Sequence, residues 1–201
     1  MASQTSIANH CLDLIGEDSI SDINDSVDRA EKIRNAWDGE RDSALRAHWW
    51  NFSIERVSLA ADSAAPNWGF DKQYSLDADV VRVIQVDQYY PPAVLSDLIN
   101  ADTSLYRIEG RKILTNLTAP LKVRWIVNSI DIGDWDACFA KVMACNLADR
   151  LSTKLTGSEA IKARIKAEKR DALREARRAN AIENPPTLAN DGRWMASRFS
   201  V

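Results

Sequence analysis

The chain has 201 residues, of which 45% are hydrophobic and 27% are charged, and it contains only 7 glycines and 6 prolines. This composition is typical of a folded protein with a hydrophobic core, and it excludes a chain that is disordered throughout, fibrous or of low complexity. The formal net charge is −3, so the bulk composition does not favour a nucleic-acid binder, and any charged binding surface must arise from the distribution of charge.

Two helices are predicted in the N-terminal part of the chain, over residues 3–15 and 26–48. In the first, apolar residues recur at spacings of three and four until Gly16, a residue type that commonly ends helices. Asp25 or Ser26 can cap the second helix, and Gly39 can bend or divide it. The chain is therefore expected to begin with helical structure.

From Trp49 onwards the sequence changes to residues typical of β-strands. Apolar residues with imperfect alternation, separated by turn-rich stretches, predict a small antiparallel sheet over residues 52–131, inserted between helical segments. Glu109-Gly110-Arg111 has the composition of a hairpin turn. The pair Trp49-Trp50 is interpreted first as an anchor between helix and sheet, and second as an exposed interface.

Two further helices are predicted over residues 135–155 and 159–181. Asp134 can cap the first of them, and Thr156-Gly157-Ser158 can end it and cap the next. The last helix has only a thin apolar stripe, mostly of alanine: Ile161, Ile165, Ala172, Ala176 and Ala179. Since such a stripe buries little surface, we expect this helix to lie against a partner or to be partly solvated.

Residues 182–201 are predicted to form an extended C-terminal tail, because the consecutive prolines Pro185 and Pro186 cannot continue a helix. Large apolar side chains on such a tail are poorly explained unless they dock on a partner. The candidate docking residues are Arg193, Trp194, Arg198 and Phe199. The sequence thus predicts a mainly helical α+β fold: a four-helix core with an inserted sheet in residues 1–181, followed by a docking tail.

Charge is distributed unequally along the chain. Residues 1–48 carry 10 acidic and 5 basic residues, a balance of −5, whereas residues 158–180 carry 8 basic and 4 acidic residues, a balance of +4. The basic helix can contact a neighbouring subunit, or phosphate groups, through five arginines: Arg164, Arg170, Arg174, Arg177 and Arg178. A solvated face is the simpler alternative, because acidic residues are interspersed at spacings that allow pairing within the helix.

The sequence offers little for catalysis. His10 and His48 do not lie near a cysteine or a carboxylate at a metal-ligand spacing, and there is no nucleotide-binding loop or hydrolase elbow. The three cysteines, Cys11, Cys138 and Cys145, sit within amphipathic helical patterns, where a free thiol behaves as a small apolar residue. We therefore expect no enzymatic activity and no cofactor.

The acidic cluster Asp131, Asp134 and Asp136 could suggest a divalent cation. It lacks the glycine and the distal glutamate of a calcium loop, so helix capping explains it more simply and we expect no metal. No stretch approaches the roughly 18 apolar residues that span a bilayer, and the N-terminus lacks a basic segment followed by an apolar run. We expect neither a membrane contact nor an export signal.

The order of these elements, together with particular phrases, resembles the tail tubular protein A family of short-tailed phages. The resemblance covers most of the chain, and a helix ending in Leu155-Thr156-Gly157-Ser158 follows as in the family. The phrases lie at residues 44–53 (ALRAHWWNFS), 74–83 (YSLDADVVRV) and 106–114 (YRIEGRKIL). The chain departs from the family at two places. The family tends to have a leucine-proline pair before the aspartate, where this chain has Ser75-Leu76-Asp77, and Trp125 stands where a tyrosine would be less unusual.

The resemblance implies a structural virion protein: a head-to-tail adaptor, or connector, located at the head-tail junction and assembled in the host cytoplasm. Its partners would be sister copies in a ring, twelve in this family, the portal, and the tail nozzle or next tail protein, with genomic DNA passing through during ejection. Residues 184–201 would then dock on the portal, and the 158–180 helix would join neighbouring subunits. The alternative prediction is a stand-alone nucleic-acid-binding helical protein that uses the basic helix 158–180.

Overall fold

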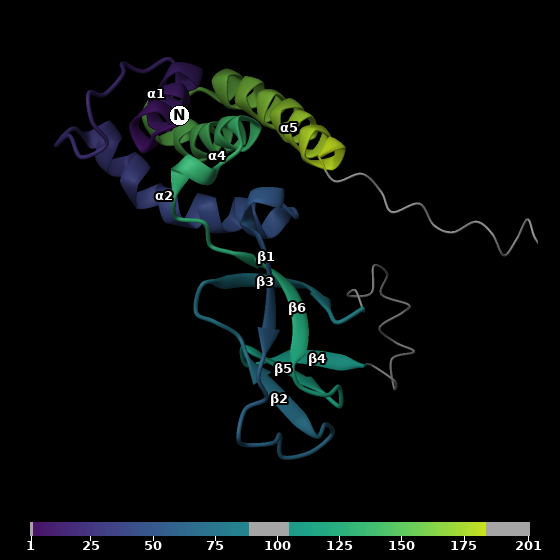
Figure 1. Cartoon of the computed structure of the whole chain (residues 1–201). Helices are drawn as coiled ribbons and strands as arrows, with labels where there is room; N and C mark the ends of the chain where they lie inside the picture. Colours follow the sequence, from purple (N-terminus) through teal and green to yellow (C-terminus); the bar gives the residue numbers. More distant parts are fainter. Residues whose placement is uncertain (1, 89–104, 184–201) are drawn as a thin grey trace, which may run out of the picture.

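The computed structural model describes residues 2–88 and 105–183, and within them the chain has the α+β fold expected from the sequence (Figure 1). The helices are α1 (Gln4–Ile15), α2 (Asp28–Ala47), α4 (Ala137–Thr156) and α5 (Glu159–Ile182). The strands are β1 (Ile54–Leu59), β2 (Lys72–Ser75), β3 (Val80–Val86), β4 (Tyr106–Glu109), β5 (Lys112–Thr115) and β6 (Leu121–Val127). Short 3-10 helices, η1 (Asn51–Ser53) and η2 (Ile132–Asp134), lead into β1 and towards α4.

Local capping residues fix most of the helix ends. The Ser3 side chain accepts a hydrogen bond from the backbone N–H of Ser6, and Ser158 caps α5 in the same way. Gly16 and Gly157 end α1 and α4 with φ angles of +88° and +64°, which glycine adopts without the steric cost of a side chain. Gly16, Gly157 and Ser158 are helix-end signals that the sequence predicted, whereas Ser3, predicted as part of α1, is its cap.

Two details of the helix predictions were wrong. Asp136, and not Asp134, caps α4, because Trp135 is still extended and the Asp136 carboxylate accepts from the Cys138 N–H. The start of α2 has no side-chain cap: Val27 occupies that position, since the Asp25 carboxylate is already used by backbone N–H groups of the preceding loop. The helix also runs unbroken through Gly39.

The main core lies between the four helices. Helix α4 is its centre, because both α1 and α2 pack on it and α5 covers it from the other side (Figure 1). Fully buried side chains such as Leu12, Ile33 and Phe139 come from three different helices. The same core continues into the strands through Ile84 of β3 and Ile126 of β6.

The strands form two three-stranded antiparallel sheets, of order β1-β6-β3 and β2-β5-β4, instead of the one small sheet predicted. A second core fills the space between them, with Tyr74 and Ile113 of one sheet fully buried beside Trp125 of the other. The hairpin β4–β5 turns at Gly110 and Arg111, with φ angles of +53° and +61°, as the Glu109-Gly110-Arg111 prediction required. The sheets extend away from the helices (Figure 1).

An aromatic cluster joins the helices to the first sheet. Phe139 of α4 is its centre, with ring centroids 5.0 Å from Trp50, 4.9 Å from Phe52 and 4.9 Å from Trp135. Trp50 is 2% exposed, and its indole N–H donates to the backbone carbonyl of Ala44. The Trp49-Trp50 pair therefore anchors helix to sheet through Trp50, as predicted, whereas Trp49 is partly exposed.

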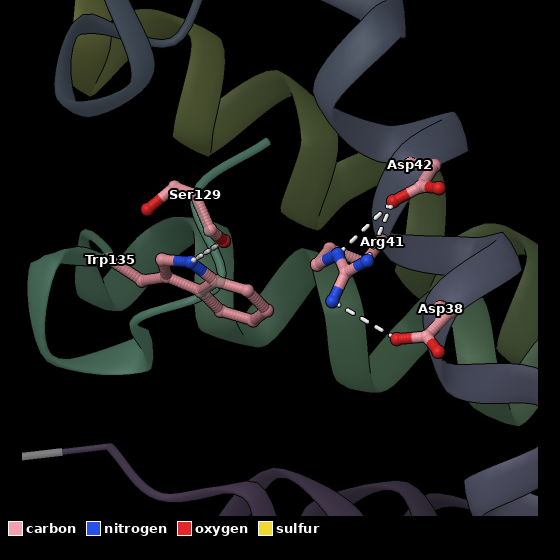
Figure 2. Close-up of polar contacts among 5 residues, drawn as sticks. All are labelled: Asp38, Arg41, Asp42, Ser129 and Trp135. Atoms are coloured by element: carbon pink, nitrogen blue, oxygen red, sulfur yellow. Dashed lines mark hydrogen bonds and ion pairs between the residues drawn. The ribbon is translucent and has the colours of Figure 1, made fainter. Parts of the chain in front are cut away.

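Trp135 is held from two sides where the chain enters α4. Its ring stacks on Trp37 of α2, with 6.1 Å between centroids and an interplanar angle of 8°, and its indole N–H donates to the Ser129 carbonyl at 3.1 Å. Figure 2 shows the hydrogen bond between Trp135 and Ser129. Arg41 of α2 lies nearby, and its guanidinium binds the Asp38 and Asp42 carboxylates at 3.0 Å each. The two contacts of Trp135, with Trp37 and Ser129, fix the path from β6 into α4.

Candidate subunit interface on helix α5

Helix α5 rests on α4 through a narrow apolar stripe. Ile165, Ala172 and Ala176 are buried, while Ile161 and Ala179 are half-buried, so the predicted stripe is the one that the helix uses. Two ion pairs border it: Lys169 Nζ lies 2.9 Å from Asp149 Oδ2, and Lys141 Nζ lies 3.1 Å from Glu175 Oε2. Since most of these buried side chains are alanines, α5 leaves a wide face exposed.

The exposed face of α5 is basic. It carries five cations at spacings of one, three and four residues, which places them on one side of the helix: Lys166, Arg170, Arg174, Arg177 and Arg178. Their side chains are exposed, and two exposed alanines, Ala163 and Ala181, lie on the same side of the helix, one beyond each end of the row. At 1.5 Å per residue the stripe is about 18 Å long. We call this surface the basic face.

Few carboxylates neutralise the basic face. Asp171, at its edge, binds Arg174 at 3.4 Å, with both side chains mostly exposed. Glu175 is used by Lys141 instead. Within the part of the chain that the structure describes, Arg170 and Arg178 have no ion pair. The interspersed acids therefore compensate the helix less than their spacing suggested, because much of their charge points towards α4.

Arg164 does not belong to the basic face. Its guanidinium donates to the backbone carbonyl of Leu14 at 2.6 Å, at the C-terminal end of α1. A cation at this end of a helix stabilises unpaired carbonyls and the helix dipole. Of the five arginines predicted together, the structure therefore brings four to one surface and gives Arg164 a role in holding α1 against α5.

The loop between α1 and α2, which belongs to the acidic N-terminal part, lies far from the C-terminal half of α5 (Figure 1). These two segments are at opposite ends of the helices. Several carboxylates of residues 1–48 are exposed. Asp13, Asp18 and Glu31 are among them, and these three have no ion-pair partner among the described residues. The predicted charge asymmetry is thus an asymmetry in space as well as in sequence.

A polar contact that sequence reasoning missed fixes the C-terminal end of α5. Asn180 accepts the Asn51 N–H at 2.8 Å through its Oδ1, and its backbone carbonyl accepts the Asn51 side chain at 2.9 Å. The Asn180 Nδ2 atom donates to the Trp49 carbonyl at 2.9 Å. The only signal in the sequence was a polar residue at a stripe position, four residues after Ala176. This Asn180 contact locks the end of α5 onto the junction between helices and sheet.

His48 and the three cysteines are buried or half-buried. Burial, and then the charge of Arg177, lower the pKa of His48. Burial raises the pKa of Cys11 to about 12 and that of Cys145 to about 11, which disfavours the reactive thiolate. Cys138, at the start of α4, is half-buried, and all three thiols are free.

The predicted aspartate cluster acts in capping. Asp131 accepts the Gly133 N–H and starts η2, while Asp136 starts α4. Among residues 2–88 and 105–183, no three His, Cys, Asp or Glu side chains gather in a way that could hold a metal ion. In the same ranges, no helix combines the length and the apolar character that crossing a membrane requires.

The remaining predicted site residues, Arg193, Trp194, Arg198 and Phe199, lie outside the described residues. Comparison of the sequence with protein-family models and with curated proteins gives no match.

Proposed function

We propose that this protein is a structural subunit of a phage head-to-tail adaptor, which assembles as a ring between the portal and the tail nozzle in the virion. The ring, of twelve copies by the resemblance, would surround the channel through which the genome leaves. Its partners are sister copies, the portal and the next tail protein, and it acts by binding and not by catalysis.

The observation that carries the proposal is the basic face of α5. A helix that buries mainly alanines and exposes a row of arginines with few neutralising carboxylates is better suited to a partner surface than to stabilising its own subunit. The small alanines at either end of the row do not obstruct another surface, and the arginine side chains can reach carboxylates on it. The basic face has the character of an interface.

The opposite placement of the two charged regions supports a ring. A ring of identical subunits uses heterologous contacts, in which one surface of a subunit meets a different surface of its neighbour. The C-terminal half of the basic face on one copy can meet the acidic loop between α1 and α2 of the next copy, which includes Asp18 and Asp22, because these two segments lie at opposite ends of the helical part (Figure 1). Such a contact would steer association and fix its direction.

The same face gives a second candidate function, phosphate binding by an isolated subunit. A row of cations about 18 Å long could contact successive phosphates of a nucleic acid. The two functions differ in a measurable way. Nucleic-acid binding would be retained by a single subunit and would weaken steeply with salt, whereas the adaptor needs sister copies and the portal.

The test is a double charge reversal, Arg170→Glu with Arg174→Glu, followed by mass measurement of the assemblies formed with portal rings. We expect the reversal to abolish or strongly reduce multi-copy assemblies, and the addition of Asp18→Arg with Asp22→Arg to restore them in part. A matched reversal on the first sheet, Arg82→Glu with Lys122→Glu, removes two exposed cations elsewhere and should leave assembly intact. Unchanged assembly by the α5 variant would exclude this interface.

A further inference from the structure

A groove lies where α5 ends, beside the junction of helices and sheet. Its volume is about 400 Å³, and it is lined by residues of three chain segments: Trp50, Asn51, Phe52, Asp134, Trp135, Asp136, Ala176, Asn180 and Glu183. This size accommodates one or two large side chains. The groove is distinct from the basic face, since Ala176 and Asn180 lie on the side of α5 that faces the rest of the protein.

The apolar part of the groove is preformed. Trp50, Phe52 and Trp135 all contact Phe139 in the aromatic cluster, and Trp135 is also stacked on Trp37. The Asn180 contact with Asn51 holds the α5 side of the groove against η1. A ligand therefore meets a rigid surface and pays little to order it.

Carboxylates surround this aromatic lining. Asp134 comes from η2, Asp136 from the cap of α4, and Glu183 from the residue that follows α5. None of the three has an ion-pair partner among the described residues. Aromatic rings next to carboxylates are the surroundings that an arginine side chain prefers, because its guanidinium can stack and form hydrogen bonds at once.

The chain itself supplies a segment with the matching chemistry. Residues 184–201 begin directly after Glu183, at the edge of the groove, and carry the neighbouring pair Arg193-Trp194. Arg193 follows Glu183 by ten positions, and an extended chain of ten steps reaches about 33 Å, more than enough to return to the groove. A tether this short gives an effective concentration in the millimolar range. The basic face of a second copy fits less well, since α5 carries no aromatic side chain beside its arginines.

We infer that the groove is the docking site for residues 184–201 of the same chain in the free subunit, with Arg193 against the carboxylates and Trp194 on the aromatic lining. Docking there keeps the two side chains from solvent until another surface competes for them. If the proposed adaptor function is correct, the portal is that competitor. The intramolecular contact itself does not depend on ring formation.

The test is amide hydrogen exchange of the full-length chain, read in the segments around residues 50–53 and 132–136. Arg193→Glu or Asp134→Lys alone should raise exchange in these segments by about tenfold. The double variant should restore protection, because it exchanges the two charges. Asp134 is the carboxylate to change, since Asp136 and Glu183 accept hydrogen bonds within the fold.

A photo-crosslinking amino acid in place of Trp194 identifies the partner surface directly. We expect an intramolecular product with a groove residue, formed with the same yield at low and high protein concentration. A crosslinked product between two chains would show that residues 184–201 bind a neighbouring chain, in its groove or on another surface. That result would overturn the inference. So would unchanged exchange in both single variants. Loss of ring assembly with intact groove docking would instead count against the proposed function alone.

Discussion

Asn180, near the end of α5, and His48, at the end of α2, share a hydrogen bond of 3.2 Å between atoms Nδ2 and Nε2 although they are 132 positions apart in sequence. The same amide nitrogen donates to the Trp49 carbonyl, so it is the donor in both contacts. Nε2 of His48 must therefore accept, which requires the neutral form of the ring. The contact couples the end of α5 to the protonation of His48.

Replacing Asn180 by alanine should destabilise the protein by about 1–3 kcal/mol, because it leaves buried or half-buried polar groups unpaired. These are the backbone N–H of Asn51 and the ring nitrogen of His48. Urea denaturation measures the change in the free energy of unfolding. Asn35→Ala, an exposed asparagine on α2, is the control and should change this free energy by less than about 0.5 kcal/mol.

Stability should decrease on mild acidification through His48. Folding lowers the pKa of His48 below its ordinary value of 6.5, so the unfolded chain takes up the proton first. The contribution of His48 is therefore complete above pH 6.5 and is lost as the pH falls towards the folded-state pKa. Thermal unfolding at several pH values measures this decline.

His48→Gln should flatten the decline, since glutamine can accept the Asn180 hydrogen bond without titrating. His10→Gln, the same change at the second histidine, should leave it in place. An identical pH dependence in wild type and His48→Gln would show that His48 is not the responsible group.

Replacing Trp135 by phenylalanine should cost about 1–3 kcal/mol of stability, because the Ser129 carbonyl loses its indole donor and the stacking on Trp37 is weakened. The same substitution at Trp68, which is 84% exposed, should leave the free energy of unfolding nearly unchanged. Chemical denaturation of both variants compares them. Equal effects would mean that the contacts of Trp135 add nothing to stability.

The cysteines should differ in reactivity. Burial raises the pKa of all three thiols, so the order of reaction should follow access. Alkylation of the buried Cys11 and Cys145 at neutral pH should follow unfolding, whereas half-buried Cys138 should react first. Peptide mass spectrometry after timed treatment with iodoacetamide gives the order. Rapid modification of Cys11 in the native protein would contradict the packing of α1 on α4.

Much of the fold could be predicted from local sequence. Gly16, Gly157 and Ser158 mark helix ends, and Gly110-Arg111 marks a hairpin, because each acts through its own backbone conformation or a nearby N–H group. The division into two sheets could not be predicted. It depends on pairs such as Ile54 with Ile126, and no local pattern specifies which distant strands meet.

The candidate interface was predicted only in part. Helical spacing correctly grouped Arg170, Arg174, Arg177 and Arg178, since periodicity defines which residues share a face. It could not separate Arg164, whose partner is a backbone carbonyl of α1. The Asn180 contacts and the groove were missed for the same reason: both depend on segments that only the tertiary fold brings together.

The most direct test of the central proposal is the mass of the purified chain, alone and mixed with portal rings, measured by native mass spectrometry with negative-stain imaging. A head-to-tail adaptor should add multiple copies to each portal ring in a fixed number, as a stacked ring. A chain that remains a single subunit at every concentration, with and without the portal, would contradict the proposal.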